Sequence, residues 1–152
     1  MDSNIKIPKS ISSEKEFIPE SFVVNVLIYD DKGRILLLKR KGEHTFYPDY
    51  WGVIMEKVKE GETFKEALHR GVYEEINLYV DENNVDQLDG DLFKVWKEKN
   101  YQIHRYFVGI GDSEIILNHE HDEYMWFDSN FHEDIDIMPD AMDMIEKFFE
   151  RN

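Results

Sequence analysis

Apolar residues in the first part of the chain follow a pattern typical of strands. Residues 21–29 (SFVVNVLIY) are rich in β-branched and aromatic side chains, which favours a strand. Residues 30–33 (DDKG) have the composition of a turn, and residues 34–40 (RILLLKR) are expected to return as a second strand. Three consecutive leucines in that run indicate a strand covered on both faces.

The second half of the chain repeats this pattern between polar turns. Residues 81–84 are polar and turn-like. Residues 86–96 and 101–110 are expected to pair as a hairpin, because both are rich in strand-forming side chains and a short polar run separates them. Shorter strands are expected at residues 114–117 and 123–127.

Two segments have helical spacing instead. A helix is predicted to start near Thr63, a suitable N-cap with Glu66 at capping-box spacing. Its apolar arc is formed by Phe64, Ala67, Leu68, Val72 and Ile76. A last helix is predicted to begin at Pro139, since proline suits the first helical turn. Strands, helix, strands and helix in this order predict an α/β fold with a mixed sheet and helices on both faces.

The composition fits one folded domain. With 152 residues, 41% of them apolar and 14% aromatic, the chain has enough apolar surface for a core and is not disordered. We expect a lead-in over residues 1–20 and a single domain over residues 21–152. The absence of cysteine excludes disulfides and thiol catalysis. Since the sequence has neither a signal peptide nor a long apolar run, we expect a cytoplasmic protein without a membrane segment.

The formal net charge of −15 restricts the partners. It argues against bulk binding of nucleic acid, which requires a basic face. A phosphorylated small molecule remains compatible with an acidic protein when divalent cations lie between the two negative charges. The sequence leaves the oligomeric state open.

One carboxylate lies at an unexpected place on the first predicted helix. Glu75 falls near the middle of the apolar arc, and Glu74 lies at its edge. A carboxylate on the core side is unfavourable unless a cation meets it, which makes a metal ion the obvious candidate.

Residues 56–78 resemble the Nudix box, in which a glycine, five residues, a glutamate and seven residues precede Arg-Glu-aliphatic-x-Glu-Glu-x-Gly-aliphatic. Six positions match at the family spacing, namely Glu62, Arg70, Val72, Glu74, Glu75 and Leu78. Three positions differ: Glu56 replaces the first glycine, Gly71 replaces a glutamate, and Asn77 replaces the last glycine.

The resemblance implies a Nudix α/β/α sandwich and a Mg²⁺-dependent hydrolase, with Mn²⁺ as a possible substitute. Its substrate would be a nucleoside diphosphate linked to another moiety, attacked by water at phosphorus. Glu74 and Glu75 would be metal ligands together with the main-chain carbonyl of Met55. Arg70 would form an ion pair with Glu74 and orient it. The same spacing also suits a solvated ladder of ion pairs from Glu66 through Arg70 to Glu74.

Gly71 leaves the box short of one carboxylate, and two residues are candidates to replace it. Glu56 lies in the loop that meets the helix. Glu120 begins the stretch EHDEYMW, which is similar to E-H-x-x-Y-x-W of diadenosine polyphosphate hydrolases in the family. We expect Glu120 to be the substitute, with Glu123 as second choice.

Candidate substrate contacts precede the box. Lys39, Arg40 and Lys57 are candidates for binding phosphate, and exposed charges without a ligand are the alternative. Tyr47 and Trp51 are candidates for stacking a nucleobase, and packing of the loop onto the sheet is the alternative.

Two further functions are weighed against hydrolysis. The departures from the box at residues 56 and 71 also suit a weakened Nudix domain that binds a nucleotide or a protein partner as a sensor. The second is isopentenyl diphosphate isomerase, which shares the family fold. Its chemistry depends on cysteine, and because this chain has no cysteine, the sequence argues against that activity.

Overall fold

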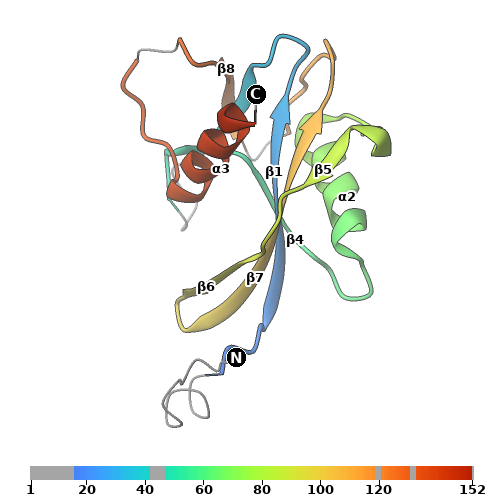
Figure 1. The fold of residues 1–152 in the computed structure, drawn as a ribbon, viewed down its shortest axis with the longest axis vertical. Coiled ribbons are helices and arrows are strands. Elements are labelled where there is room, and N and C mark those ends of the chain that lie inside the picture. Colours follow the sequence, from blue (N-terminus) through green and yellow to red (C-terminus); the bar gives the residue numbers. More distant parts are fainter. Residues whose placement is uncertain (1–15, 42–46, 119–120, 131–132, 152) are drawn as a thin grey trace.

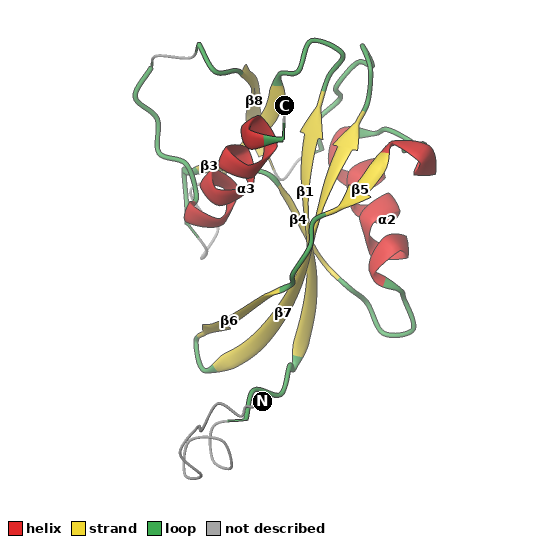
Figure 2. Cartoon of the chain, in the orientation of Figure 1, coloured by secondary structure: helices red, strands yellow, loops and turns green. Residues whose placement is uncertain are grey.

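The structure is a computed structural model that describes residues 16–41, 47–118, 121–130 and 133–151. Its elements follow the predicted order of strands, helix, strands and helix (Figure 2). They are β1 (Ser21–Tyr29), β2 (Ile35–Arg40), β3 (Trp51–Gly52), β4 (Ile54–Lys57), α2 (Phe64–Ile76), the 3₁₀ turn η1 (Glu82–Asn84), β5 (Val85–Gln87), β6 (Leu92–Trp96), β7 (Lys99–Gly109), β8 (His121–Phe127) and α3 (Pro139–Glu150).

Strand β1 is the centre of one mixed sheet. It pairs in parallel with β7 from Ser21 to Tyr29. On its other edge it pairs antiparallel with β4 over Val23–Val26 and with β2 at Tyr29. Helix α2 covers one face of the sheet and α3 covers the other (Figure 1). The predicted α/β sandwich is therefore confirmed.

The three leucines of β2 show how the sheet divides two cores. Leu36 and Leu38 pack in the cluster beneath α2, whereas Leu37 packs in the cluster beneath α3. All three are buried, which confirms a strand covered on both faces. The pattern thus follows from the alternation of side chains along a strand between two layers of helix.

The ends of α2 are fixed locally by its own sequence. The Thr63 hydroxyl oxygen accepts a hydrogen bond from the Glu66 N–H, and the Glu66 carboxylate accepts one from the Thr63 N–H. This capping box confirms the predicted start. Asn77 ends the helix in the left-handed conformation, with φ of 62°, where the family pattern has glycine.

Two sequence expectations about strands need correction. Residues 114–117 form no strand; instead, the N–H groups of Ile116 and Asn118 donate to the carbonyls of Ile76 and Glu75 at the end of α2. The strand expected over residues 86–96 is interrupted at residues 88–91, where Gly90 has a φ of 79°. Its two pieces, β5 and β6, both pair with β7.

The β6–β7 hairpin, with the first part of β1 beside it, extends away from both helices (Figure 1). We call this projection the arm, defined as residues 92–103. Neither of the two helices in the described part of the chain is long and apolar enough to span a membrane.

Candidate active site

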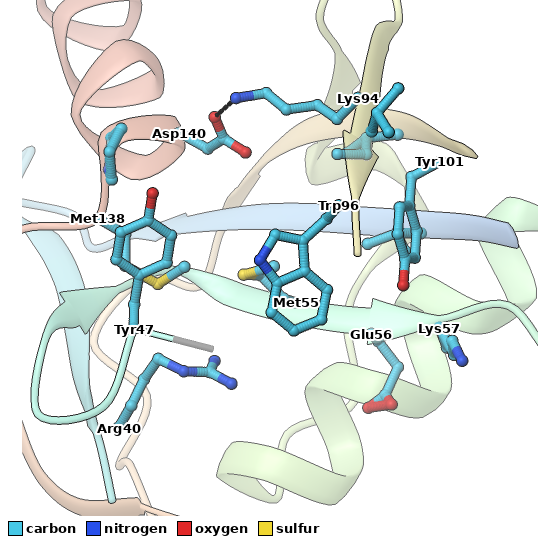
Figure 3. Close-up of a pocket in the computed structure, with 14 residues that line it drawn as sticks. Arg40, Tyr47, Met55, Glu56, Lys57, Lys94, Trp96, Tyr101, Met138 and Asp140 are labelled. Atoms are coloured by element: carbon cyan, nitrogen blue, oxygen red, sulfur yellow. Dashed lines mark hydrogen bonds and ion pairs between the residues drawn. The ribbon is translucent and has the colours of Figure 1, made fainter. Parts of the chain in front are cut away.

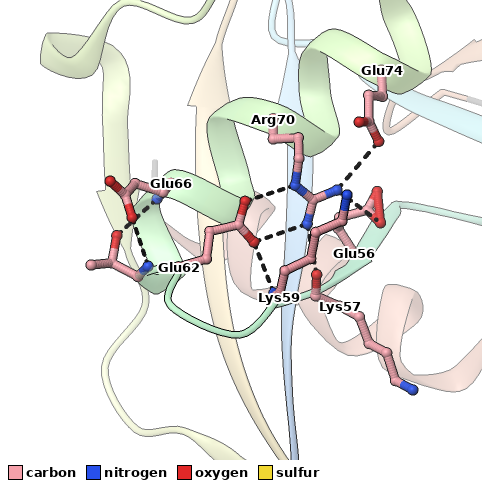
Figure 4. A network of polar contacts seen from close by, with 8 residues as sticks. Glu56, Lys57, Lys59, Glu62, Glu66, Arg70 and Glu74 are labelled. Carbon is pink, nitrogen blue, oxygen red and sulfur yellow. Dashed lines mark hydrogen bonds and ion pairs between the residues drawn. The ribbon is translucent and has the colours of Figure 1, made fainter.

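Arg70 on α2 is the centre of a group of carboxylates (Figure 4). Its Nε donates to Glu62 Oε2 at 2.7 Å and its Nη2 donates to Glu62 Oε1 at 3.0 Å. Nη2 also donates to the carbonyl oxygen of Lys57 at 2.8 Å. The expected contact with Glu74 exists but is longer, at 3.3 Å from Nη1. Arg70 therefore fastens the loop before α2 to the helix.

This arrangement fixes the charges of the two main partners. The hydrogen bonds from Arg70 hold the pKa of the Glu62 carboxyl at about 2, and the same carboxylate raises the pKa of Arg70. Both groups are ionised at neutral pH. Of the alternative ladder of ion pairs, the contact between Arg70 and Glu74 is present. The Glu66 carboxylate instead accepts a hydrogen bond from the Thr63 N–H, as part of the helix cap.

Adjacent carboxylates of α2 point to different surroundings. Glu75 is only 3% exposed and lies on the core side of the helix, as its place in the apolar arc predicts. The side chain of Glu74 is half exposed at the edge. Two neighbouring residues on a helix diverge by about 100°, so a ligand that meets both must approach along this edge.

Gly71 and Glu56 occupy one space between α2 and β4. A Cβ atom added at Gly71 would lie 2.9 Å from Cγ, 3.0 Å from Cβ and 3.4 Å from Oε2 of Glu56. The first contact is shorter than real Cβ atoms show and the second is tighter than nearly all of them, so the Glu56 side chain would have to move. The Glu56 side chain therefore fills the place that a side chain at residue 71 would occupy.

A cleft of about 390 Å³ opens beside this group, on the face of the sheet that α3 covers (Figure 3). It lies between β4, the arm and the start of α3. Its charged lining residues are Arg40, Glu56, Lys57, Lys94 and Asp140; its uncharged ones are Val23, Tyr47, Met55, Val95, Trp96, Tyr101, Ile103, Met138 and Pro139. Lys94 and Asp140 form an ion pair of 2.6 Å that joins β6 to α3. Carboxylate, cationic and aromatic side chains thus meet in one cleft.

Comparison with known proteins identifies the family. The model of the NUDIX domain matches residues 20–147. The chain belongs to the NUDIX family.

Relatives of this Nudix domain include curated proteins and solved structures. An uncharacterized Nudix hydrolase of Listeria innocua is 35% identical over 63 residues, which are 41% of this chain and 37% of that protein, so the match spans little more than a third of the relative. The dihydroneopterin triphosphate diphosphatase of Escherichia coli is 28% identical over 123 residues, which are 73% of this chain and 79% of that protein. The MutT protein of Methanosarcina mazei has a TM-score of 0.71 and 25% identity, over 88% of this chain and 96% of that one.

A fourth comparison supports the fold alone. The NUDIX domain of Shewanella oneidensis NrtR, solved with ADP ribose, superposes with a TM-score of 0.71 at 16% identity, over 95% of this chain and 99% of that one.

Nudix hydrolases generally use divalent metal ions, and the donors near α2 suit such an ion. Glu56, Glu74, Glu75 and the carbonyl of Met55 are oxygen donors, which Mg²⁺ prefers. Within the described ranges, however, no three acidic or histidine side chains are arranged as a metal site. Glu56 and Glu74 face Arg70 instead, at 3.5 and 3.3 Å. The oxygen donors therefore suit Mg²⁺ in their chemistry, and the space beside Gly71 is filled by the Glu56 carboxylate.

The other site residues expected from the sequence are separated by the fold. Arg40, Tyr47 and Lys57 line the cleft. Lys39 lies 3.7 Å from Glu123 on the neighbouring strand β8 and is not among the cleft residues described. Trp51 is 8% exposed and packs in the core beneath α3, which agrees with the packing alternative. Glu120 lies outside the described residues.

Sequence reasoning missed the far wall of the cleft. Trp96, Tyr101 and Lys94 come from the arm, and Met138 and Asp140 come from the start of α3. Trp96, which stands next to a charged turn, is a local signal in the sequence that could have indicated a ligand contact. Its place opposite β4 depends on the interruption at residues 88–91, which the hydrophobic pattern does not reveal. Glu62 was recognised as a box position but not as the main partner of Arg70.

Proposed function

We propose that this Nudix domain is a divalent-metal-dependent hydrolase of a nucleoside diphosphate linked to another moiety, with water attacking phosphorus. The observation that supports it best is the cleft itself. One wall has Glu56 and Lys57 beside α2, the helix of the Nudix box, and the other has Trp96 and Tyr101. A substrate with an aromatic ring and a diphosphate would place each part against a matching wall.

The aromatic wall suits a planar heterocycle. Trp96, Tyr101 and Tyr47 provide π faces and edges, and stacking of a base on an aromatic side chain contributes about 1–3 kcal/mol. One relative supports this chemistry, since it is named for dihydroneopterin triphosphate, a compound that joins a heterocycle to phosphates.

The cationic residues and the box supply the remaining roles. Lys57 and Arg40 line the cleft and would bind phosphate oxygens. Glu74, Glu75 and the Met55 carbonyl would hold Mg²⁺ or Mn²⁺, which supplies charge neutralisation and activation of water when bound. Arg70 would act as a positioning residue, because it holds Glu62, the Lys57 carbonyl and Glu74 in one arrangement. Lys94, paired with Asp140, would join the base of the arm to the start of α3 and so fix the distance between these two parts of the cleft.

The experiment is a hydrolysis screen with and without metal. Dinucleoside polyphosphates, ADP ribose, nucleoside triphosphates and dihydroneopterin triphosphate are incubated with Mg²⁺, Mn²⁺ or EDTA. We expect metal-dependent release of a phosphorylated product from at least one of them, and none from Glu75→Gln. Tight nucleotide binding without turnover under all conditions would favour the sensor instead, the function that Gly71 motivates.

The aromatic wall is tested separately. Trp96→Ala should raise KM by about tenfold or more, from the lost stacking, with a smaller effect on kcat. Phe93→Ala is the matched control, since Phe93 is an exposed aromatic residue of the same strand and is not among the cleft residues. An equal KM in both variants would place the heterocycle elsewhere.

A further inference from the structure

We propose that Glu56 of β4 supplies the carboxylate ligand that α2 lacks at Gly71, so that one metal-binding side chain has moved from the helix to the strand. The proposal rests on the proposed function only in taking the box helix as a metal site. It takes the other of the two sequence-based candidates, since Glu120 lies outside the described residues.

The first argument is the shared space. A Cβ at Gly71 would lie 2.9 Å from Glu56 Cγ. The carboxylate also lies close to that position, with Oε2 at 3.4 Å from it. Glu56 lies on β4, the strand that packs against α2, so its side chain reaches Gly71 from the opposite side.

The second argument is that the two departures from the box explain each other. Residue 56 is a glutamate where the pattern has glycine, and residue 71 is a glycine where the pattern has glutamate. Because the two positions compete for one space, glutamate at both would bring side-chain atoms into collision and two like charges together. Glycine at both would leave the gap empty. Each change alone is unfavourable, whereas the pair conserves one carboxylate.

The third argument is that Arg70 does not require Glu56. Glu62 already accepts from Nε and Nη2 of Arg70, and the Lys57 carbonyl accepts from Nη2 as well. The Glu56 carboxylate is 3.5 Å from Nη1, beyond a good hydrogen bond, and its side chain is 22% exposed at the edge of the cleft. A carboxylate that only fastened the arginine would be expected closer to it. At the cleft edge its side chain is partly exposed, where an ion bound beside α2 would meet it.

The test is a set of five variants of the full chain: Glu56→Gln, Glu56→Gly, Gly71→Glu, the double variant Glu56→Gly/Gly71→Glu, and Glu60→Gln. Glu56→Gln keeps the size and a hydrogen-bond acceptor but removes the charge. Glu60→Gln removes one charge from the exposed loop nearby and serves as the control. Mn²⁺ affinity is measured by calorimetry and by the loss of the free-ion electron paramagnetic resonance signal, and folding is checked by circular dichroism.

We expect Glu56→Gln to weaken Mn²⁺ binding by about tenfold or more, since charge on the ligands sets the affinity for a hard cation. Gly71→Glu alone should also weaken it, through crowding. The double variant should bind within about threefold of the natural protein, because the carboxylate is restored from the other side. Glu60→Gln should bind normally.

Wild-type affinity in Glu56→Gln would overturn the proposal. So would a double variant that folds but binds Mn²⁺ no better than Glu56→Gly, or a Gly71→Glu variant that binds more tightly than the natural protein. A natural protein that binds no Mn²⁺ would overturn it as well. Since all of these readouts are equilibrium binding, they stay valid if no substrate is hydrolysed. A protein that binds Mn²⁺ through Glu56 and hydrolyses none of the substrates would therefore overturn the hydrolase and leave the metal ligand in place.

Discussion

Replacing Arg70 by alanine tests whether this residue holds the box together. The change removes two hydrogen bonds to the Glu62 carboxylate, one to the Lys57 carbonyl and a longer one to Glu74. Hydrogen bonds to charged groups contribute about 1.5–3 kcal/mol each. Because the side chains of Arg70 and Glu62 are 19% and 16% exposed, water reduces this contribution, and we expect a total loss of about 3 kcal/mol.

The pH dependence follows from Glu62. Its pKa is about 2 in the folded protein against 4.5 for the free side chain. A lowered pKa stabilises the fold above the unfolded value, and this stabilisation is lost as the pH falls from 4.5 towards 2. The difference in unfolding free energy between the natural protein and Arg70→Ala should therefore be constant around neutral pH and should shrink in acid.

The assay is urea unfolding followed by tryptophan fluorescence, at neutral pH and at about pH 3. In a thermal melt at neutral pH, a loss of about 3 kcal/mol in unfolding free energy would lower the melting temperature by about 6–12 °C in a domain of this length. Lys65→Ala is the control, because Lys65 forms an exposed ion pair with Glu82 that should contribute less than about 1 kcal/mol. Equal losses in the two variants, or a loss for Arg70→Ala that persists in acid, would refute the reasoning.

Three further predictions concern single positions. Asn25 is fully buried, and its amide has no hydrogen-bond partner among the described residues. Asn25→Leu should therefore raise the unfolding free energy by about 1–2 kcal/mol. A lower unfolding free energy in the urea titration would show that the amide is hydrogen-bonded. Asn77→Ala should lower the unfolding free energy by about 1 kcal/mol, because alanine resists the left-handed conformation, while Asn77→Gly should not; equal melting temperatures would contradict this. Glu75→Gln should abolish metal-dependent turnover with an unchanged circular dichroism spectrum, and near-normal turnover would remove Glu75 from the site.

Features governed by local spacing could be predicted from the sequence. The limits of β1, the capping box at Thr63 and the core-side placement of Glu75 all follow from the periodicity of strand and helix. They depend on residues a few positions apart. The helix start at Pro139 has the same origin.

Features governed by packing between distant elements could not be predicted from the sequence. Trp51 and Tyr47 are aromatic residues of the same short segment, and Trp51 is buried because it pairs with residues 136–138, just before α3, while Tyr47 lines the cleft. The proximity of Glu56 to Gly71 depends on the depth at which α2 settles on β4, which no pattern within either element records. The expectation for Glu120 stays a prediction, because Glu120 lies outside the described residues.

The parallel pairing of β1 with β7 has a consequence for how the chain reaches its fold. Ser21 pairs with Tyr101, so partners along the central strand are 80 residues apart (101 − 21 = 80). Pairings of this sequence separation form slowly, because a large loop must close first. During synthesis β1 has an apolar edge that stays unpaired until β7 has left the ribosome, a state prone to aggregation. A chain that ended at residue 97 and still remained monomeric would contradict this order of events.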